Sequence, residues 1–422
     1  MKILVLSNLY PPDVIGGYEL ACAHAVDGLR SRGHEVRVLT STPRRPVPPA
    51  PHVARNLALA DVYDHEWMAR SSSVVLWLKH AEAHLVNAHN VHVLIAAIEE
   101  FRPDVVYVCN LIGLGGLTLM ACLQYLKVPW IWQLGDCLPK ALCHLPQGVV
   151  PALAREFGRA LVGTYIVVSR RLLQEIEDAG ITLPGRVEVL PNWVRGDRPA
   201  ARARYYRGGH LRVASAGQLG YHKGVHLIIE AAALLCDEGH DDVAFEIYGD
   251  GDVQAFQTLI RKLGVADRVR LMGPRTQEEI AALFGNYDVF LFPTWSREPF
   301  GMAPLEAAAA GCVPVISESC GIGEWLVHGV HCLKAERTAA AFAGVLREII
   351  EGRIDLEPLG RRGAAAAWRD FHLDVYLDKL ERLMDRAARQ ARSGAGSPDE
   401  AYRLALLAEK LTKVLIQEAA PR

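Results

Sequence analysis

The chain has 422 residues, of which 50% are hydrophobic, and a formal net charge of −2. This length exceeds what one hydrophobic core normally holds and predicts two domains of about 200 residues each. The balanced charge gives no general attraction for nucleic acid, so no nucleic-acid partner is expected.

The cysteines and the apolar runs indicate a cytoplasmic protein. The nine cysteines include no C-x-x-C pair, and an odd number cannot all pair within the chain, which favours reduced thiols. The first apolar run, residues 3–6, is too short for the core of a signal peptide and fits a first β-strand. No stretch approaches the roughly 20 apolar residues of a membrane helix, and peripheral contact with a membrane stays open.

Strand-like runs alternate with helical patterns in the first half of the chain, which predicts a doubly wound parallel sheet. The proline-rich run at 43–51 cannot pair centrally in a sheet and is expected to be a loop. Residues 193–209, rich in Arg, Gly and Ala, are expected to link two domains. The expected strands are 3–9, 35–40, 104–108, 129–133, 165–168 and 187–190, with a helix at 18–30.

The same alternation returns in the second half. Strands are expected at 212–216, 244–248, 268–272, 289–292 and 313–316, with helices between them and after about residue 360. Ser397 begins a capped helix in which Leu404, Leu407, Leu411 and Val414 recur at helical spacing. This helix packs on the body of the protein or forms a homodimer contact, and the sequence leaves both open.

The sequence EPFGMAPLE places two glutamates around a predicted helix start. Glu298 is expected on a loop at the carboxyl end of a strand, and Glu306 two turns into the next helix. Phe300, Gly301 and Met302 lie at the helix start, where free N–H groups and the helix dipole favour an anion. Ligands of open α/β sheets bind at such strand ends. Carboxylates on both sides of an anion site suit a nucleotide sugar.

Two further loops follow predicted strands. In SAGQLGYHKGVHLIIEA, Lys223 precedes a glycine and a helix, where it can reach a phosphate. Gly16 and Gly17 come between the first strand and its helix, where glycines let backbone N–H groups approach a ligand closely. The alternatives are a solvated surface lysine and a structural Gly-Gly turn.

Together these segments resemble the retaining glycosyltransferase family 4, among the glycosyl transferases of group 1. The E-x(7)-E signature, its Ala-rich helix, the strand GCVPVI and the K-G segment carry the resemblance, which spans about residues 1–385. It implies the GT-B fold, an α/β architecture with two Rossmann-like domains that face a cleft. The implied divisions are an acceptor-binding domain at 1–195, a linker at 196–209, a donor-binding domain at 210–375 and C-terminal helices at 376–422.

The resemblance also implies roles for these residues. A nucleotide-diphosphate sugar is the expected donor, and the acceptor is a saccharide, a lipid-linked molecule or a small molecule. Lys223 would grip the diphosphate, Glu306 the ribose hydroxyls and Glu298 the hydroxyls of the donor sugar. Gly16 and Gly17 would face the diphosphate and acceptor, and backbone groups around Gly273 would hold the base. No cofactor and no enzymic nucleophile are expected.

The chain departs from the family pattern at two positions. Gln218 stands where the family has an arginine on the diphosphate, and Arg275 or Arg297 is a candidate to compensate. Gly135 stands where many members have a histidine on the acceptor side. The next residue, Asp136, fits the family aspartate and either holds an acceptor hydroxyl or caps the following segment. A degenerate sugar-nucleotide binder or scaffold and a GT-B nucleotide-sugar epimerase are therefore the alternatives.

No metal site is expected. Asp250 and Asp252 resemble a D-x-D motif but fit a strand-to-helix turn better. His80 and His84 have zinc spacing on a helix, with His89 and His92 nearby, but no ligand set is complete. Among the tryptophans, Trp295 is the best candidate to stack on a sugar, and Trp130 and Trp132 are expected in the core.

Overall fold

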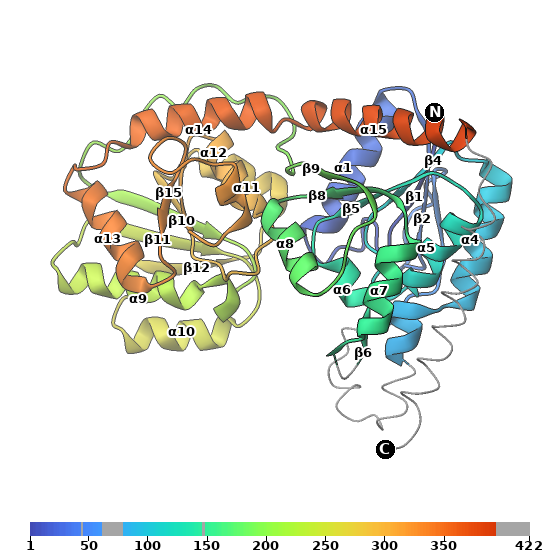
Figure 1. Ribbon diagram of the computed structural model, residues 1–422. Coiled ribbons are helices and arrows are strands. Elements are labelled where there is room, and N and C mark those ends of the chain that lie inside the picture. The colour runs from blue at the N-terminus through green and yellow to red at the C-terminus, as the bar shows by residue number, and fades with distance from the viewer. Residues whose placement is uncertain (44, 61–78, 146–147, 394–422) are drawn as a thin grey trace, which may run out of the picture. The chain divides into compact units, whose positions relative to one another are not determined.

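The computed structural model describes residues 1–43, 45–60, 79–145 and 148–393 (Figure 1). The chain forms two compact units. The first contains the described residues of 1–190 and 377–393, and the second contains Pro191–Tyr376. The helix predicted after Ser397, with its dimer alternative, lies outside the described residues.

The first unit is built on a seven-stranded sheet in the order β3-β2-β1-β4-β5-β8-β9. Every neighbouring pair in it is parallel, which confirms the predicted sheet. The central strands β1, β4 and β5 are mostly apolar and buried, as strands of a parallel sheet covered on both faces are. The strands are β1 (Lys2–Leu6), β2 (Glu35–Ser41), β3 (Val53–Leu57), β4 (Val105–Val108), β5 (Trp130–Leu134), β8 (Gly163–Val167) and β9 (Gly185–Val189).

The helices of the first unit connect these parallel strands, except α15, which follows the second unit in the chain and belongs to the first unit from Leu377 on. The last one, α15, lies against α1: a Cβ on Gly28 would come within 2.4 Å of Leu377, and Arg32 pairs with Asp378 and Glu381 at 2.7 and 2.8 Å. A short hairpin, β6 (His144–Leu145) and β7 (Gly148–Val149), stands apart from the sheet. The helices are α1 (Gly17–Ser31), the π-helix η1 (Ala81–Leu85), α4 (Ala88–Phe101), α5 (Gly116–Tyr125), α6 (Leu138–Leu142), α7 (Pro151–Ala160), α8 (Arg170–Asp178) and α15 (Leu373–Ser393).

The second unit is built on a six-stranded parallel sheet in the order β12-β11-β10-β13-β14-β15. Its inner strands supply the apolar core of the unit. The strands are β10 (Leu211–Ala216), β11 (Val243–Tyr248), β12 (Val269–Gly273), β13 (Val289–Phe292), β14 (Val313–Ser317) and β15 (Leu333–Ala335).

Helices cover both faces of this second sheet (Figure 1). On one face α9 packs with α10 and α13, and on the other α12 packs with α11 and α14. The helices are α9 (Val225–Asp237), α10 (Val253–Lys262), α11 (Gln277–Phe284), α12 (Met302–Ala309), α13 (Ala339–Ile350) and α14 (Leu356–Asp370), with 3₁₀ turns η2 (Tyr221–Lys223) and η3 (Gly321–Glu324).

Several details differ from the sequence expectations. Two edge strands, β3 and β15, were not predicted, because β3 includes the polar residues Arg55 and Asn56 and β15 has only three residues. Glu306 is the fifth residue of α12, so it lies just over one turn into the helix and not two. Within the part of the chain that the structure describes, no helix has the length and apolarity needed to cross a membrane.

Candidate functional site

The strongest candidate site lies at the switch point of the second sheet. The chain order reverses between β10 and its neighbour β13, and the loops that leave their carboxyl ends, residues 217–224 and 293–301, flank that point. Side chains on two such loops converge at the crevice where open α/β sheets bind ligands. This is where the sequence placed Lys223 and Glu298.

Lys223 and Glu298 contact each other across these two loops. The Lys223 Nζ lies 2.5 Å from the Glu298 Oε2, and the Thr294 hydroxyl donates to the same oxygen at 3.1 Å. Both side chains are mostly covered, with 26% of Lys223 and 12% of Glu298 exposed. The sequence predicted both residues for one site but not their direct ion pair.

The loop that carries Glu298 is held by the turn after β14. The Gly321 and Ile322 N–H groups donate to the carbonyl oxygens of Glu298 and Phe300 at 3.1 and 2.7 Å. The Ser317 hydroxyl donates to the Thr294 carbonyl at 2.8 Å. These bonds fix the backbone on both sides of the glutamate before any ligand arrives.

Two glycines allow the close packing of these loops. Gly301, the N-cap of α12, has φ of 98°, and a Cβ there would lie 3.1 Å from the Phe292 ring. Gly224 has φ of 76°, and its Cβ would lie 2.1 Å from the Pro293 carbonyl oxygen. Met302 then begins α12, so Phe300, Gly301 and Met302 occupy the helix start as predicted.

Arg337 joins the two loops and was missed by the sequence reasoning. Its guanidinium donates to the Pro293 carbonyl at 3.0 Å and to the Tyr221 carbonyl at 2.7 Å. One side chain therefore holds the loop of Lys223 against the loop of Glu298. No motif marks this arginine, which follows the unpredicted strand β15.

Glu306 faces the loop between β12 and α11. The Gln277 side-chain amide donates to its carboxylate, and the second Gln277 amide atom, Oε1, is buried with no hydrogen-bond partner among the described residues. Burial raises the pKa of the Glu306 carboxyl, and the Gln277 bond opposes that rise. Gly273, at φ of 75°, ends β12 four residues before Gln277, the first residue of α11. The sequence predicted Gly273 and Glu306 but missed Gln277.

Among the described residues, no other arginine takes the place of the family arginine at Gln218. Gln218 is exposed and has no bonding partner within the described residues. Arg275 donates to the Pro274 carbonyl at 2.9 Å, and the Arg297 guanidinium lies 5.5 Å from the centre of the Trp295 ring. Neither of these arginines contacts Gln218 in the described part of the chain.

The tryptophans divide as expected. Trp130 and Trp132 are core residues, 4% and 0% exposed. Trp295, at 38%, presents its ring beside His222, with ring centres 5.2 Å apart. Of the three, Trp295 is the only exposed one.

In the first unit, Tyr18 fills the space beside Gly135. The Tyr18 hydroxyl donates to the Gln133 carbonyl and accepts the Gly135 N–H at 3.2 Å. A Cβ on Gly135 would lie 2.7 Å from the Tyr18 ring. Burial raises the pKa of Tyr18, so the phenol keeps its proton. The departure at Gly135 is therefore matched by an aromatic side chain from α1.

The turn before α1 has its own carboxylate, which the sequence reasoning also missed. Glu19, 3% exposed, accepts the N–H groups of Gly16 and Ile15 at 2.9 and 3.2 Å. Gly16 and Gly17 are exposed, as a ligand-facing turn requires. Tyr18 bonds bring this turn to the strand end that carries Asp136, whose Oδ1 accepts the Cys137 N–H at 2.7 Å.

The residues considered as metal ligands lie in two separate places. Gly251 pairs with Leu219 between β11 and α10, so Asp250 and Asp252 lie in the predicted strand-to-helix turn. The His80 and His84 ring centres are 5.6 Å apart on η1. Among the described residues, no group of three His, Cys, Asp or Glu side chains is arranged to hold a metal ion.

Two family models together match most of the chain. Residues 15–198 match Glycosyltransferase Family 4, and residues 200–366 match Glycosyl transferases group 1. Glycogen synthase of Mycobacterium tuberculosis is 28% identical over 389 residues, which cover 87% of this chain and 90% of that protein. The amylovoran biosynthesis glycosyltransferase AmsK of Erwinia amylovora is 31% identical over 185 residues, 42% of this chain and 45% of that one.

Solved structures share the two-unit architecture. Sucrose-phosphate synthase from Thermosynechococcus elongatus has a TM-score of 0.69 at 16% identity and covers 91% of this chain and 98% of its own. Anabaena Alr3699/HepE, solved in complex with UDP, has a TM-score of 0.65 at 18% identity, with 92% and 100% covered. At these identities the likeness concerns the fold, which is GT-B.

Proposed function

Because the chain belongs to the GT-B glycosyltransferases of group 1 and family 4, we propose that it transfers a sugar with retention and without a metal. The sugar moves from a nucleotide-diphosphate donor to an acceptor hydroxyl. The observation that carries this proposal is the Lys223–Glu298 pair at the switch point of the second sheet. In the proposal, residues 210–375 bind the donor and residues 1–195 bind the acceptor.

The donor roles follow from charge and burial. Lys223 supplies the cation for the departing diphosphate, together with backbone N–H groups at Gly301 and Met302, which is the main electrostatic task of such a transfer. Glu298, fixed by its loop, orients hydroxyls of the donor sugar. Glu306 and the Gln277 Oε1, which has no hydrogen-bond partner among the described residues, accept ribose hydroxyls. Backbone groups near Gly273 hold the base.

The chemical step needs no nucleophile from the protein. The bond between the anomeric carbon and the diphosphate oxygen breaks, and the acceptor oxygen bonds to that carbon on the face the diphosphate leaves. The acceptor proton passes to a diphosphate oxygen. Lys223 stabilises the negative charge that builds up on the leaving group.

The acceptor roles belong to the first unit. The Glu19 carboxylate behind Gly16 disfavours a phosphate at that turn, so in this proposal the turn serves hydroxyl groups of the acceptor. Asp136, exposed at the end of β5, is the carboxylate placed to accept from such a hydroxyl. A saccharide suits these groups, and a lipid-linked or small-molecule acceptor also carries the hydroxyl that is needed.

A turnover assay tests the proposal. The chain is incubated with UDP-, GDP-, ADP- and TDP-sugars, and release of the nucleoside diphosphate is measured with and without EDTA. UDP-glucose is the first donor to try, because HepE was also solved with UDP-glucose. We expect release that survives EDTA, and nuclear magnetic resonance of the product to show the anomeric configuration of the donor.

Other outcomes identify the alternatives. Binding without any release indicates a degenerate binder, and conversion of the donor sugar to its epimer indicates an epimerase. Inverted product would contradict retention, and loss of activity in EDTA with rescue by magnesium or manganese would contradict the metal-free step.

A further inference from the structure

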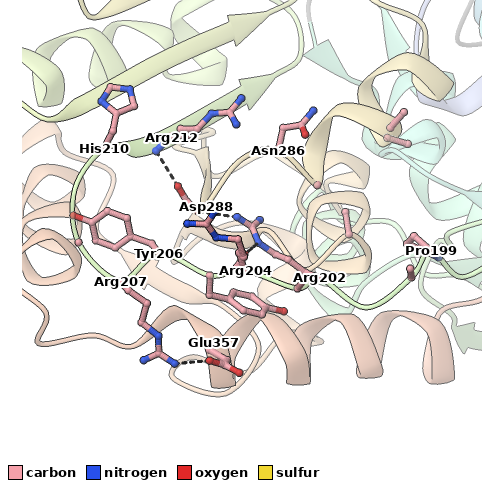
Figure 2. Close-up of a pocket in the computed structure, with 18 residues that line it drawn as sticks. Pro199, Arg202, Arg204, Tyr206, Arg207, His210, Arg212, Asn286, Asp288 and Glu357 are labelled. Carbon is pink, nitrogen blue, oxygen red and sulfur yellow. Dashed lines mark hydrogen bonds and ion pairs between the residues drawn. The ribbon is translucent and has the colours of Figure 1, made fainter.

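A pocket lies at the amino ends of the strands in the second unit's sheet, at the end opposite to the candidate donor site. Its wall is formed by the start of β10, the residue before β13, the ends of α11 and α12 and the segment 199–212. Its volume is about 940 Å³. The six residues of β10, at about 3.3 Å each, separate it by 15–20 Å from the loop of Lys223. Figure 2 shows His210 and Arg212 on one side, Arg207 and Glu357 on the other, and Arg202, Arg204 and Asp288 between them.

Each carboxylate that lines this pocket is already paired. Asp288 accepts the Arg202 guanidinium at 2.7 Å and the Arg212 backbone N–H at 3.0 Å. Glu357 pairs with Arg361 at 2.9 Å and also with Arg207. These contacts account for the structural use of Arg202 and Arg207, which tie the segment to the body of the unit.

Two arginines of the pocket have no carboxylate partner in the described part of the chain. Arg204 is exposed, and its backbone carbonyl accepts from Arg202 while its own guanidinium pairs with nothing. Arg212 is also exposed, and its guanidinium lies 5.3 Å from the centre of the Tyr287 ring. Among the described residues that line the pocket, two guanidinium groups therefore lack a carboxylate partner, and both carboxylates are already paired.

The surrounding sequence concentrates positive charge at this place. Residues 193–212 contain six arginines and one aspartate, a net charge of +5 in a chain whose total is −2. Small side chains at Ala281, Ala282 and Ala310 leave the floor open. Guanidinium groups bind phosphate and carboxylate oxygens in pairs of parallel hydrogen bonds, and a phosphate group, with three acceptor oxygens and a charge of up to about −2, suits two guanidinium groups at once.

We propose that this pocket binds a phosphate-bearing ligand through Arg204 and Arg212, at a site separate from the donor site. The ligand is a free phosphorylated molecule or the headgroup of an anionic lipid, since both present the same phosphate oxygens. The inference does not depend on the proposed transfer reaction.

The test uses the full chain and two probes, inorganic pyrophosphate and vesicles of phosphatidylcholine with phosphatidylglycerol. Hydrogen exchange reports pyrophosphate binding separately for peptides 199–212 and 217–225, so the donor loop does not confuse the result. Co-sedimentation reports vesicle binding. The variant is Arg204→Gln/Arg212→Gln, and the control is Arg198→Gln, an exposed arginine just before the segment 199–212 that does not line this pocket.

We expect one probe to bind, with affinity at least about 10-fold lower in the double variant and nearly unchanged in the control. Arg204→Lys/Arg212→Lys, which keeps the charge but not the paired bonds, should fall between them and guards against misfolding. Protection of 199–212 by pyrophosphate identifies a free ligand, and binding to vesicles alone identifies a lipid headgroup. Failure of both probes, or equal losses in Arg198→Gln, would overturn the proposal.

Discussion

The carboxyl ends of the strands carry different kinds of side chains in the two sheets. In the second unit, Lys223 and Glu298 form a mostly covered ion pair between two loops that Arg337 fastens together. In the first unit, the neutral ring of Tyr18 fills the corresponding strand end beside Gly135. The strand ends of the second unit are held by an ion pair, and those of the first by the packing of a neutral ring. This difference is expected if the second unit binds a diphosphate and the first binds a hydroxyl-bearing acceptor.

The largest effect should come from removing the Lys223–Glu298 ion pair of the second unit. Lys223→Ala removes the only cation paired with Glu298 among the described residues and leaves that carboxylate uncompensated. We expect donor turnover to fall by about 10²–10³-fold, the size seen when a donor to a developing negative charge is removed. The rate of nucleotide release measures this. Lys262→Ala, an exposed lysine at the end of α10, serves as the control, and equal rates for both variants would exclude Lys223 from the site.

Replacing Glu306 tests how the second unit binds the nucleotide. Glu306→Ala removes a carboxylate that accepts from Gln277 and, in the proposal, from ribose. Loss of a charged hydrogen-bond acceptor should weaken nucleoside diphosphate binding by about 1.5–3 kcal/mol in calorimetry. Gln277→Ala should weaken it less, because only a neutral amide is lost. Unchanged affinity in Glu306→Ala would remove this residue from the donor site.

In the first unit, adding a single methyl group at Gly135 should lower stability. Gly135→Ala places a Cβ 2.7 Å from the Tyr18 ring, which its hydroxyl bonds hold in place. We expect a loss of about 1–3 kcal/mol in the free energy of unfolding, measured by denaturant titration. Gly16→Ala, with φ of −160° and open space around its Cβ, should be nearly neutral.

A double variant separates this clash from other effects. Tyr18→Ala creates room, so Gly135→Ala should cost little in that background, a coupling that a double-mutant cycle measures. If the two losses simply add, the Tyr18 ring is not what requires a glycine at 135.

The parts of the molecule that the sequence predicted are local. Buried strands such as β13 follow from their unbroken apolar runs, and the helix start at Met302 follows from the glycine before it. Lys223 and Glu298 were placed by motif and by the rule for parallel sheets.

The parts that escaped prediction depend on distant contacts. Arg337 binds loops more than 40 residues away in sequence, and Tyr18 reaches a backbone 115 residues away. Gln277 meets Glu306 across 29 residues. Single residues that act through such contacts leave no periodic or compositional signal, so only the folded chain reveals them.

The smallest effect concerns Gln218. Gln218→Arg adds a cation within the loop of Lys223, at an exposed position that has no bonding partner among the described residues. Affinity for a nucleoside diphosphate should rise by about 0.5–1.5 kcal/mol, and more at low salt, because screening weakens charge attraction. Gln218→Lys should give a smaller gain, since it lacks the paired bonds of arginine. An unchanged or lower affinity in a folded Gln218→Arg variant would mean that this loop does not face the diphosphate.

The most direct test of the central claim is calorimetric titration of UDP, GDP, ADP and TDP into the intact chain and into Lys223→Ala/Glu306→Ala. The account predicts that one of these nucleotides binds the unaltered chain at one site, and that the double variant binds it at least about 100-fold more weakly, as the loss of two charged contacts implies. Equal binding by both proteins, or no binding of any nucleoside diphosphate to the unaltered chain, would contradict a donor site at this edge of the second sheet.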